Sequence, residues 1–321
     1  MSELRKAFLK STGLTFDIDG LLANASADKK AELFNKLNWQ MKQGVIVDNI
    51  TSPKAEENVE VIIKLAESLQ LDNIDLDGDG EVSTEELIIN EKVVVAKEKK
   101  QEIEDKKAET TALKICTLEE LNAAIETGGA FSVNGNIVID TYLNINSDIN
   151  LFLNNTTIER EGTEGNKTVL YSTAGNITIN GEGTFRGASA IWAAGTSNFI
   201  IKGGHFIMTC KDPAEDSGYP LIYSTGGTII IEDGMFESNV IDNVSFKKPQ
   251  FNLLNVKDSL EQTQIVVKGG KFKNFNPANN YSEGYDTSFV AEGYTVMVNG
   301  VENLEPYFVE LGDVIYEVVK K

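Results

Sequence analysis

Four segments in the C-terminal two thirds of the chain share one pattern, in which two apolar residues precede a polar corner and then Gly, a variable residue and Phe. They are Ile177 to Phe185, Ile200 to Phe206, Ile230 to Phe236 and Val266 to Phe272. Their phenylalanines are separated by 21, 30 and 36 residues, which fits a short basic turn with insertions of unequal length. Such a repeat predicts a solenoid, because each turn leaves an apolar face that only the next turn covers.

Alternation within these segments predicts strands. Side chains at every second position are expected to point inward, and they are Ile177, Ile179, Phe199, Ile201, Ile229, Ile231, Ile265 and Val267. The residues expected outward are Thr178, Ile200, Ile230 and Val266. An antiparallel sandwich also uses short strands with Gly corners, but it does not require Gly-x-Phe after each strand pair. The pattern therefore favours a right-handed parallel β-helix over residues 111–321, followed at its end by a C-terminal strand region.

The solenoid is expected to begin well before its first Gly-x-Phe element. Short apolar runs at Asn136 to Asp140, Leu143 to Ile145 and Ile149 to Leu153 extend the same pattern toward the N-terminus. Leu118 to Glu126 reads instead as an amphipathic helix. We expect this helix to cap the open end of the stack, since an uncapped end exposes apolar side chains and strand edges.

Residues 1–110 have a helical pattern, so the 321 residues divide into two predicted domains, 1–110 and 111–321. One helix is expected over Ala27 to Gln43, and a second opens at Ser52 and Pro53. A third, from Ser83 to Lys107, is so rich in Glu and Lys that it resembles a solvated connector. The expected fold class is therefore a small α region followed by an all-β domain.

Residues 75–86 match a calcium-binding loop at every ligand position. The predicted oxygen ligands are Asp75, Asp77, Asp79, Glu81, Ser83 and Glu86, and Gly80 supplies the sharp turn. The loop resembles the EF-hand and dockerin-like calcium repeats. An unpaired hand without Met-rich helices is a poor sensor, so Ca²⁺ is expected to fix the angle between two helices.

Composition excludes several classes of function. A net charge of −20 repels nucleic acid, and no window is long and apolar enough for a membrane span. Met1 to Leu22 lacks a signal-peptide core, so we expect synthesis in the cytoplasm without signal-directed secretion. Cys116 and Cys210 lie far apart with His205 as the only histidine, which argues against disulfide scaffolds and zinc sites.

An acidic insertion, residues 211–219, is the best candidate for catalysis. Asp212, Glu215 and Asp216 lie close together there, and Asp233 or Glu237 could supply a partner carboxylate. Parallel β-helices include lyases and hydrolases of polysaccharides, but fold analogy does not establish an activity. We expect a solvated insertion, with polysaccharide depolymerase activity as the alternative. His205 is expected to be a surface residue.

Aromatic residues between the turns suggest contact with carbohydrate. They are Trp192, Tyr219, Tyr223, Tyr281, Tyr285 and Phe289. Exposed rings at these positions could stack on sugar faces. Packing against the stack or against a neighbouring subunit is the alternative explanation.

Two C-terminal segments, Gly269 to Asn280 (GGKFKNFNPANN) and Ser288 to Val296 (SFVAEGYTV), carry a family resemblance. They resemble β-helical virion appendages, head-fibre and decoration proteins of phages that infect gut Bacteroidota. The resemblance implies a non-enzymatic virion protein that is attached to a capsid or tail through residues 1–110. Its β-helix would project outward and could bind host-surface glycans. A calcium-dependent bacterial surface adhesin is a further alternative.

The expected oligomer is a homotrimer. Ile200, Ile230 and Val266 are apolar although alternation directs them outward. Fibrous appendages close most simply about a three-fold axis, which would place these side chains against neighbouring copies. The alternative is that the insertion at residues 239–262 folds back over this face within one chain.

Overall fold

The computed structural model describes residues 94, 98, 101, 105–162, 167–209, 220–238, 253–258, 260, 264–280, 282, 287–305 and 313–321. The chain divides into two compact units, Met1–Ala108 and Glu109–Lys321. The described residues of the first unit are helical. The helices predicted before residue 94 and the calcium loop at residues 75–86 lie outside the described residues.

The second unit is rich in β-strands. Its elements in chain order are β1 (Leu113–Ile115), α7 (Leu118–Thr127), β2 (Gly129–Val133), β3 (Ile137–Ile139), β4 (Leu143–Asn144), β5 (Ile149–Leu153), β6 (Thr157–Arg160), β7 (Thr168–Ser172), β8 (Asn176–Gly181), β9 (Thr184–Gly187), β10 (Ser189–Ala194), β11 (Asn198–Met208), β12 (Ile222–Thr225), β13 (Thr228–Ser238), β14 (Leu254–Val256), β15 (Ile265–Val267), β16 (Lys271–Lys273), β17 (Tyr294–Val298), β18 (Val301–Glu302) and β19 (Ile315–Lys320). None of the helices in the described residues is long and apolar enough to cross a membrane.

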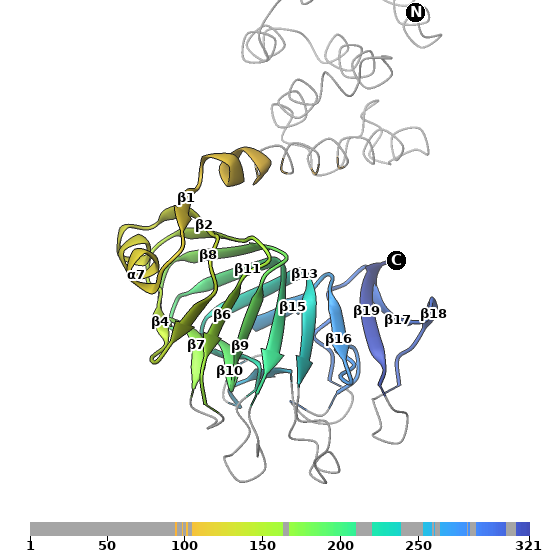
Figure 1. Ribbon diagram of the computed structural model, residues 1–321. Helices are drawn as coiled ribbons and strands as arrows, with labels where there is room; N and C mark the ends of the chain where they lie inside the picture. Colours follow the sequence, from red (N-terminus) through yellow and green to blue (C-terminus); the bar gives the residue numbers. More distant parts are fainter. Residues whose placement is uncertain are drawn as a thin grey trace, which may run out of the picture. The chain divides into compact units, whose positions relative to one another are not determined.

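These strands form two sheets (Figure 1). The larger has the order β1-β2-β5-β8-β11-β13-β16-β19-β17-β18, with β3, β6, β9 and β15 joined beside this path. The smaller has the order β14-β12-β10-β7-β4. From β7 to β16 the chain passes repeatedly between the two sheets, and all pairings between named strands up to β16 are parallel. This parallel pairing differs from the antiparallel sandwich considered as an alternative.

The repeated phenylalanines form a continuous stack in the core. Phe185, Phe206, Phe236 and Phe272 pair in register on neighbouring strands, and each is fully buried. Successive ring centroids are 5.3, 4.9 and 4.8 Å apart, with interplanar angles of 17°, 4° and 10°. The predicted inward side chains are also buried, and the four predicted outward ones are half-buried. The alternation predicted from the sequence is confirmed at these positions.

In β11 and β13 the polar corner before the phenylalanine does not interrupt the strand. It is an irregularity within one continuous strand, with register shifts around Lys202. Gly204, Gly234 and Gly270 occupy the Gly of Gly-x-Phe in three successive repeats of that pattern and have φ of 100°, 127° and 97°. L-residues avoid this region, so glycine is required to keep the chain direction at these three corners.

A second corner is held by hydrogen bonds between side chains of successive repeats. Asn176 donates from Nδ2 to Oδ1 of Asp148 at 3.0 Å, and Asn198 donates from Nδ2 to Oδ1 of Asn176 at 3.3 Å. Thr228 continues the line by donating its hydroxyl to Oδ1 of Asn198 at 2.7 Å. The ladder keeps equivalent residues aligned in four successive turns.

The predicted helix is present as α7, at the β1 end of the larger sheet (Figure 1). Thr117 caps its N-terminus, since its side chain accepts from the Glu120 N–H while Glu120 accepts from the Thr117 N–H. Leu121, Ala124 and Ile125 are buried in the shared core. The helix thus covers apolar side chains where the stack begins, as the sequence predicts.

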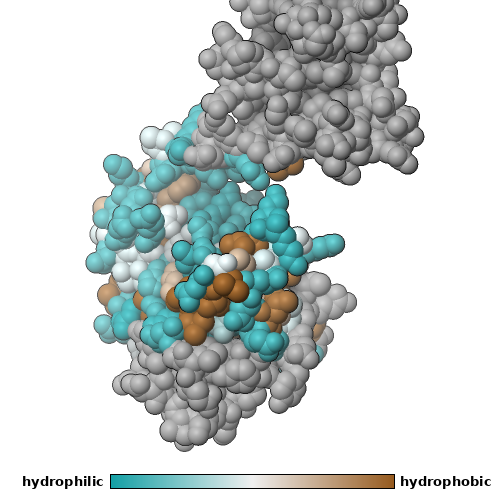
Figure 2. Space-filling view, turned by 90° about the vertical axis from the view of Figure 1, so that its right-hand side faces the viewer, coloured by the Kyte–Doolittle hydropathy of each residue, from teal (hydrophilic) through white to brown (hydrophobic). Residues whose placement is uncertain are grey.

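The C-terminal strand region predicted from the sequence closes the other end of the stack, but with antiparallel pairing that the sequence does not predict. Strand β19 pairs antiparallel with β16, placing Tyr316 opposite Phe272, and β17 and β18 add two more antiparallel strands. Figure 2 faces this end and shows apolar side chains gathered on it. Val301, in the last strand of the larger sheet, is 68% exposed, and Leu304 is 54% exposed. The parallel ladder therefore stops at β16.

Candidate functional site

Four aromatic side chains lie next to one another on the outward side of the smaller sheet. Tyr171 in β7, Trp192 in β10 and Tyr223 in β12 are direct register partners in neighbouring parallel strands. Tyr142 lies just before β4 and packs against Tyr171. Their neighbours Leu170, Ile191 and Ile222 are fully buried, so alternation directs the rings away from the core. We call these four residues the aromatic row.

The rings of the row contact one another edge to face. The centroids of Tyr142 and Tyr171 are 5.3 Å apart at 69°, and those of Tyr171 and Trp192 are 5.3 Å apart at 72°. Trp192 and Tyr223 lie 6.0 Å apart at 46°. The row thus advances by about one ring per strand, across the strands, at close to the strand spacing.

Polar side chains hold the row in place and continue it. The Trp192 indole Nε1–H donates to Oγ1 of Thr225 at 2.7 Å, which fixes the ring against the neighbouring strand. Asn255 follows Tyr223 in register and donates from Nδ2 to the Ser282 carbonyl at 3.2 Å. Asn144, the register partner of Tyr171, is exposed at the other end. Amide and hydroxyl groups therefore flank the rings.

The smaller sheet carries no charge in its strands. None of β4, β7, β10, β12 and β14 contains Asp, Glu, Lys or Arg, although 24% of the chain is charged. Arg160 lies at one end of the row, with its guanidinium 5.9 Å from the Tyr142 ring centroid. Arg160 Nη1 donates to the Thr168 carbonyl at 2.8 Å. Desolvation lowers the pKa of Arg160, and the charge of Asp140 opposes that shift.

The structure brings together two of the six predicted sugar-contact residues, Trp192 and Tyr223. Phe289 is only 3% exposed and belongs to the core, which agrees with the alternative explanation that this ring packs against the stack. Tyr219, Tyr281 and Tyr285 lie outside the described residues.

Sequence reasoning missed Tyr142 and Tyr171 as members of the row. A detectable pattern links three of its members, because an aliphatic residue, an aromatic residue and a small residue follow one another in LYS, IWA and IYS. These triplets are centred on Tyr171, Trp192 and Tyr223. Tyr142 lies outside this pattern and joins the row only through the fold.

The remaining predicted site residues are less informative. The calcium loop and the acidic insertion at 211–219 lie outside the described residues. No group of three or more potential metal ligands occurs in the part of the chain that the structure describes. The His205 side chain is 34% exposed, and its Nε2 lies 2.8 Å from Oε1 of Glu237. It is therefore half-buried beside a carboxylate, rather than a free surface residue.

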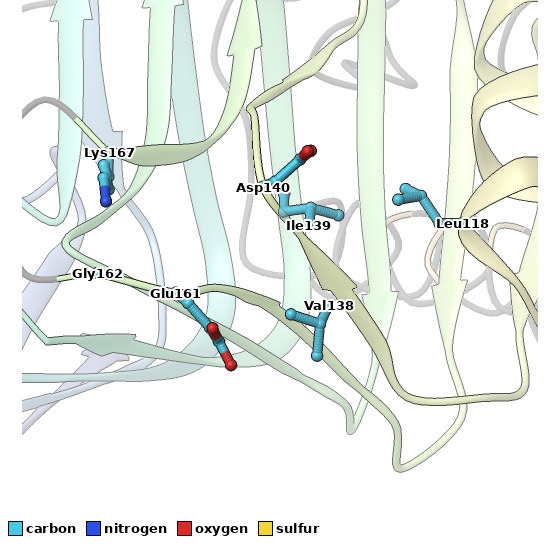
Figure 3. Close-up of a pocket in the computed structure, with 7 residues that line it drawn as sticks. All are labelled: Leu118, Val138, Ile139, Asp140, Glu161, Gly162 and Lys167. Atoms are coloured by element: carbon cyan, nitrogen blue, oxygen red, sulfur yellow. The ribbon is translucent and has the colours of Figure 1, made fainter.

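An open pocket lies beside α7, β3 and the end of β6 (Figure 3). Its charged lining residues are Asp140, Glu161 and Lys167. The Asp140 and Glu161 side chains point in different directions, so this pocket does not bring two carboxylates together as glycoside hydrolysis requires. The aromatic row is the stronger candidate for a functional site.

No family model, curated protein or solved structure matches this chain. A function for it must therefore be argued from the chemistry of the site.

Proposed function

We propose that this protein is a non-enzymatic attachment protein whose residues 111–321 form a right-handed parallel β-helix that binds glycans. The alternation between two parallel sheets, the stacked phenylalanines and the side-chain ladder from Asp148 to Thr228 support the β-helix. A β-helix suits attachment, since it is rigid and repeats the same surface position in each turn.

The observation that carries the proposal is the aromatic row. Aromatic faces bind sugars because the C–H face of a pyranose packs on the ring while its hydroxyl groups bond to nearby polar side chains. Tyr171, Trp192 and Tyr223 lie in a line, and Thr225 and Asn255 supply polar groups beside them. The four rings form a continuous aromatic surface on one outward face, where Tyr142 is 43% exposed and the other three are partly exposed.

The proposed setting is a virion. In this proposal residues 1–110 attach to a capsid or tail protein, and Ca²⁺ at Asp75, Asp77, Asp79, Glu81, Ser83 and Glu86 fixes two helices of that region. The resemblance of Gly269 to Asn280 and of Ser288 to Val296 to phage appendage proteins supports this setting. Recovery of the chain in purified particles tests the location, and its absence from them would contradict it.

We further propose self-association as a homotrimer through the outward stripe of the larger sheet. Ile200, Ile230 and Val266 are register partners in three neighbouring strands and are half-buried in a single chain. Burial of these side chains against other copies would remove apolar surface from water.

Incubation of the purified protein with capsular polysaccharide tests the attachment function. We expect retention of the protein by the polysaccharide with no new reducing ends and no unsaturated products. Release of either product would instead favour a depolymerase, and the acidic segment at residues 211–219 would become the first place to mutate. A variant with Asp212, Glu215 and Asp216 changed to Asn or Gln would then lose the activity.

A further inference from the structure

We infer that the aromatic row binds one uncharged, unbranched polysaccharide chain that lies across the strands, with Trp192 at its centre. This inference rests on the proposed glycan-binding function and specifies its ligand. It follows from the direction of the row, the charges around it and the angles between its rings.

The direction of the row sets the direction of the ligand. Its rings occupy one position in each of several neighbouring strands, so the line from Tyr142 to Tyr223 crosses the strands instead of following one of them. Steps of 5.3, 5.3 and 6.0 Å between centroids are comparable to the length of one sugar residue in an extended chain. A linear chain can therefore meet successive rings with successive sugars, whereas a single sugar would meet only one or two.

The charge distribution favours an uncharged ligand. A carboxylated or sulfated sugar placed on β7, β10 or β12 would lose hydration without gaining a cation from these strands. Arg160 lies only at the Tyr142 end, where it already donates to Thr168 and feels the charge of Asp140. The net charge of −20 adds a repulsive field for polyanions. The polar side chains beside the rings, Thr225 and Asn255, are uncharged and suit hydroxyl groups.

The ring angles favour a single chain over the flat face of a crystalline polysaccharide. A flat face would need neighbouring rings to lie in one plane. Tyr142 and Tyr171 meet at 69°, and Tyr171 and Trp192 at 72°. An isolated chain can twist to offer a sugar face to one ring and a sugar edge to the next, which a crystal surface cannot do.

Trp192 is expected to be the anchor of the site. It has ring neighbours on both sides in Tyr171 and Tyr223, and its indole N–H is already bonded to Thr225. The ring is therefore held in position before the ligand arrives, and little side-chain entropy is lost on binding.

Affinity electrophoresis of the full chain tests this inference. The probes are soluble neutral polysaccharides (hydroxyethyl cellulose, a linear β-1,3-glucan and a linear mannan), polyanions (alginate and polygalacturonate) and insoluble microcrystalline cellulose. We expect retention by a soluble neutral polysaccharide, little change in that retention with added salt, and neither retention by the polyanions nor pull-down by the crystals. Trp192→Ala should weaken retention by at least about tenfold, as loss of a central aromatic anchor does.

Two further variants separate loss of the site from loss of the fold. Trp192→Phe keeps a ring but loses the bond to Thr225, so its retention should lie between that of Trp192→Ala and that of the wild type. Val301→Ala removes an exposed apolar side chain away from the row and should leave retention unchanged. All variants should keep the wild-type circular dichroism spectrum at the temperature of the assay.

Each adverse outcome has its own meaning. Absence of retention by every probe would overturn the proposed glycan-binding function together with this inference. Salt-sensitive retention by a polyanion that Trp192→Ala abolishes would leave that function in place and overturn the uncharged ligand. Neutral retention unaffected by Trp192→Ala would overturn the site, and stronger binding to the crystals than to soluble chains would overturn the single-chain geometry.

Discussion

Phe236 offers the sharpest test of the physical reasoning about the core. Its side chain is fully buried, and its ring stacks between Phe206 at 4.9 Å and Phe272 at 4.8 Å. Truncation to alanine removes the ring from the middle of the stack and leaves both neighbours without a partner on one side. The cavity cannot close easily, because the strands on either side hold the backbone in register.

Replacement of a buried phenylalanine by alanine costs about 3–5 kcal/mol in lost transfer energy and cavity formation. Each lost ring pair adds about 0.5–1.5 kcal/mol beyond buried area, so the upper part of that range is expected. For a domain of this size, each kcal/mol lowers the melting temperature by about 2–4 °C. The melting temperature of Phe236→Ala should therefore lie more than about 6 °C below that of the wild type.

Thermal and urea unfolding followed by circular dichroism measure this effect. Val301→Ala is the control, since Val301 lies in a strand of the same sheet, outside the proposed trimer stripe, and is 68% exposed. Its destabilisation should be clearly smaller. Equal melting temperatures for Phe236→Ala and the wild type would refute the burial of the stack and the register on which it depends.

Three further predictions concern other parts of the chain. Calorimetric titration with Ca²⁺ should give heat for the wild type and a much weaker site for Glu86→Gln, because the bidentate ligand at position 12 is lost; equal affinities would end the proposal. Light scattering should give three times the chain mass of 35.1 kDa for the wild type and a lower mass for Ile230→Asp, and a wild-type mass near one chain at micromolar concentration would refute the trimer. Hydrogen bonds from Lys273 and Asn274 lower the pKa of Asp313, so the contribution of this carboxylate to stability is present above the usual Asp pKa of about 3.9 and is lost as the pH falls through the lower folded value. An NMR titration should show this lowered pKa and its return toward the usual value in Lys273→Met, whereas equal values in both proteins would contradict the assignment.

The sequence was informative wherever a local pattern repeats. Gly-x-Phe spacing correctly placed Phe185, Phe206, Phe236 and Phe272 in one stack, since each turn must present the same side chain at the same point. Helix α7 was predictable to within one residue of its end, because its cap and its apolar face are both local signals.

Other features depend on contacts that local patterns do not encode. The antiparallel closure at β19 joins segments more than forty residues apart in sequence, and nothing in IYEVVK specifies pairing with Lys271 to Lys273. Tyr142 joins the aromatic row only because β4 lies beside β7. Phe289 looked like a free aromatic residue in a loop, but the fold places it in the core.

The different closures of the two ends leave only the interior of the stack free to change in length. Residues 176–197 form one repeat of the stack, because Asn176 and Asn198 are register partners, and they contain one core phenylalanine, Phe185, and one ring of the row, Trp192. An internal duplication of this segment would lengthen the domain by a strand spacing while α7 and β19 keep their places. It would also add one ring to the row, so that the length of the domain and of the proposed glycan-binding surface would increase together through the same genetic event.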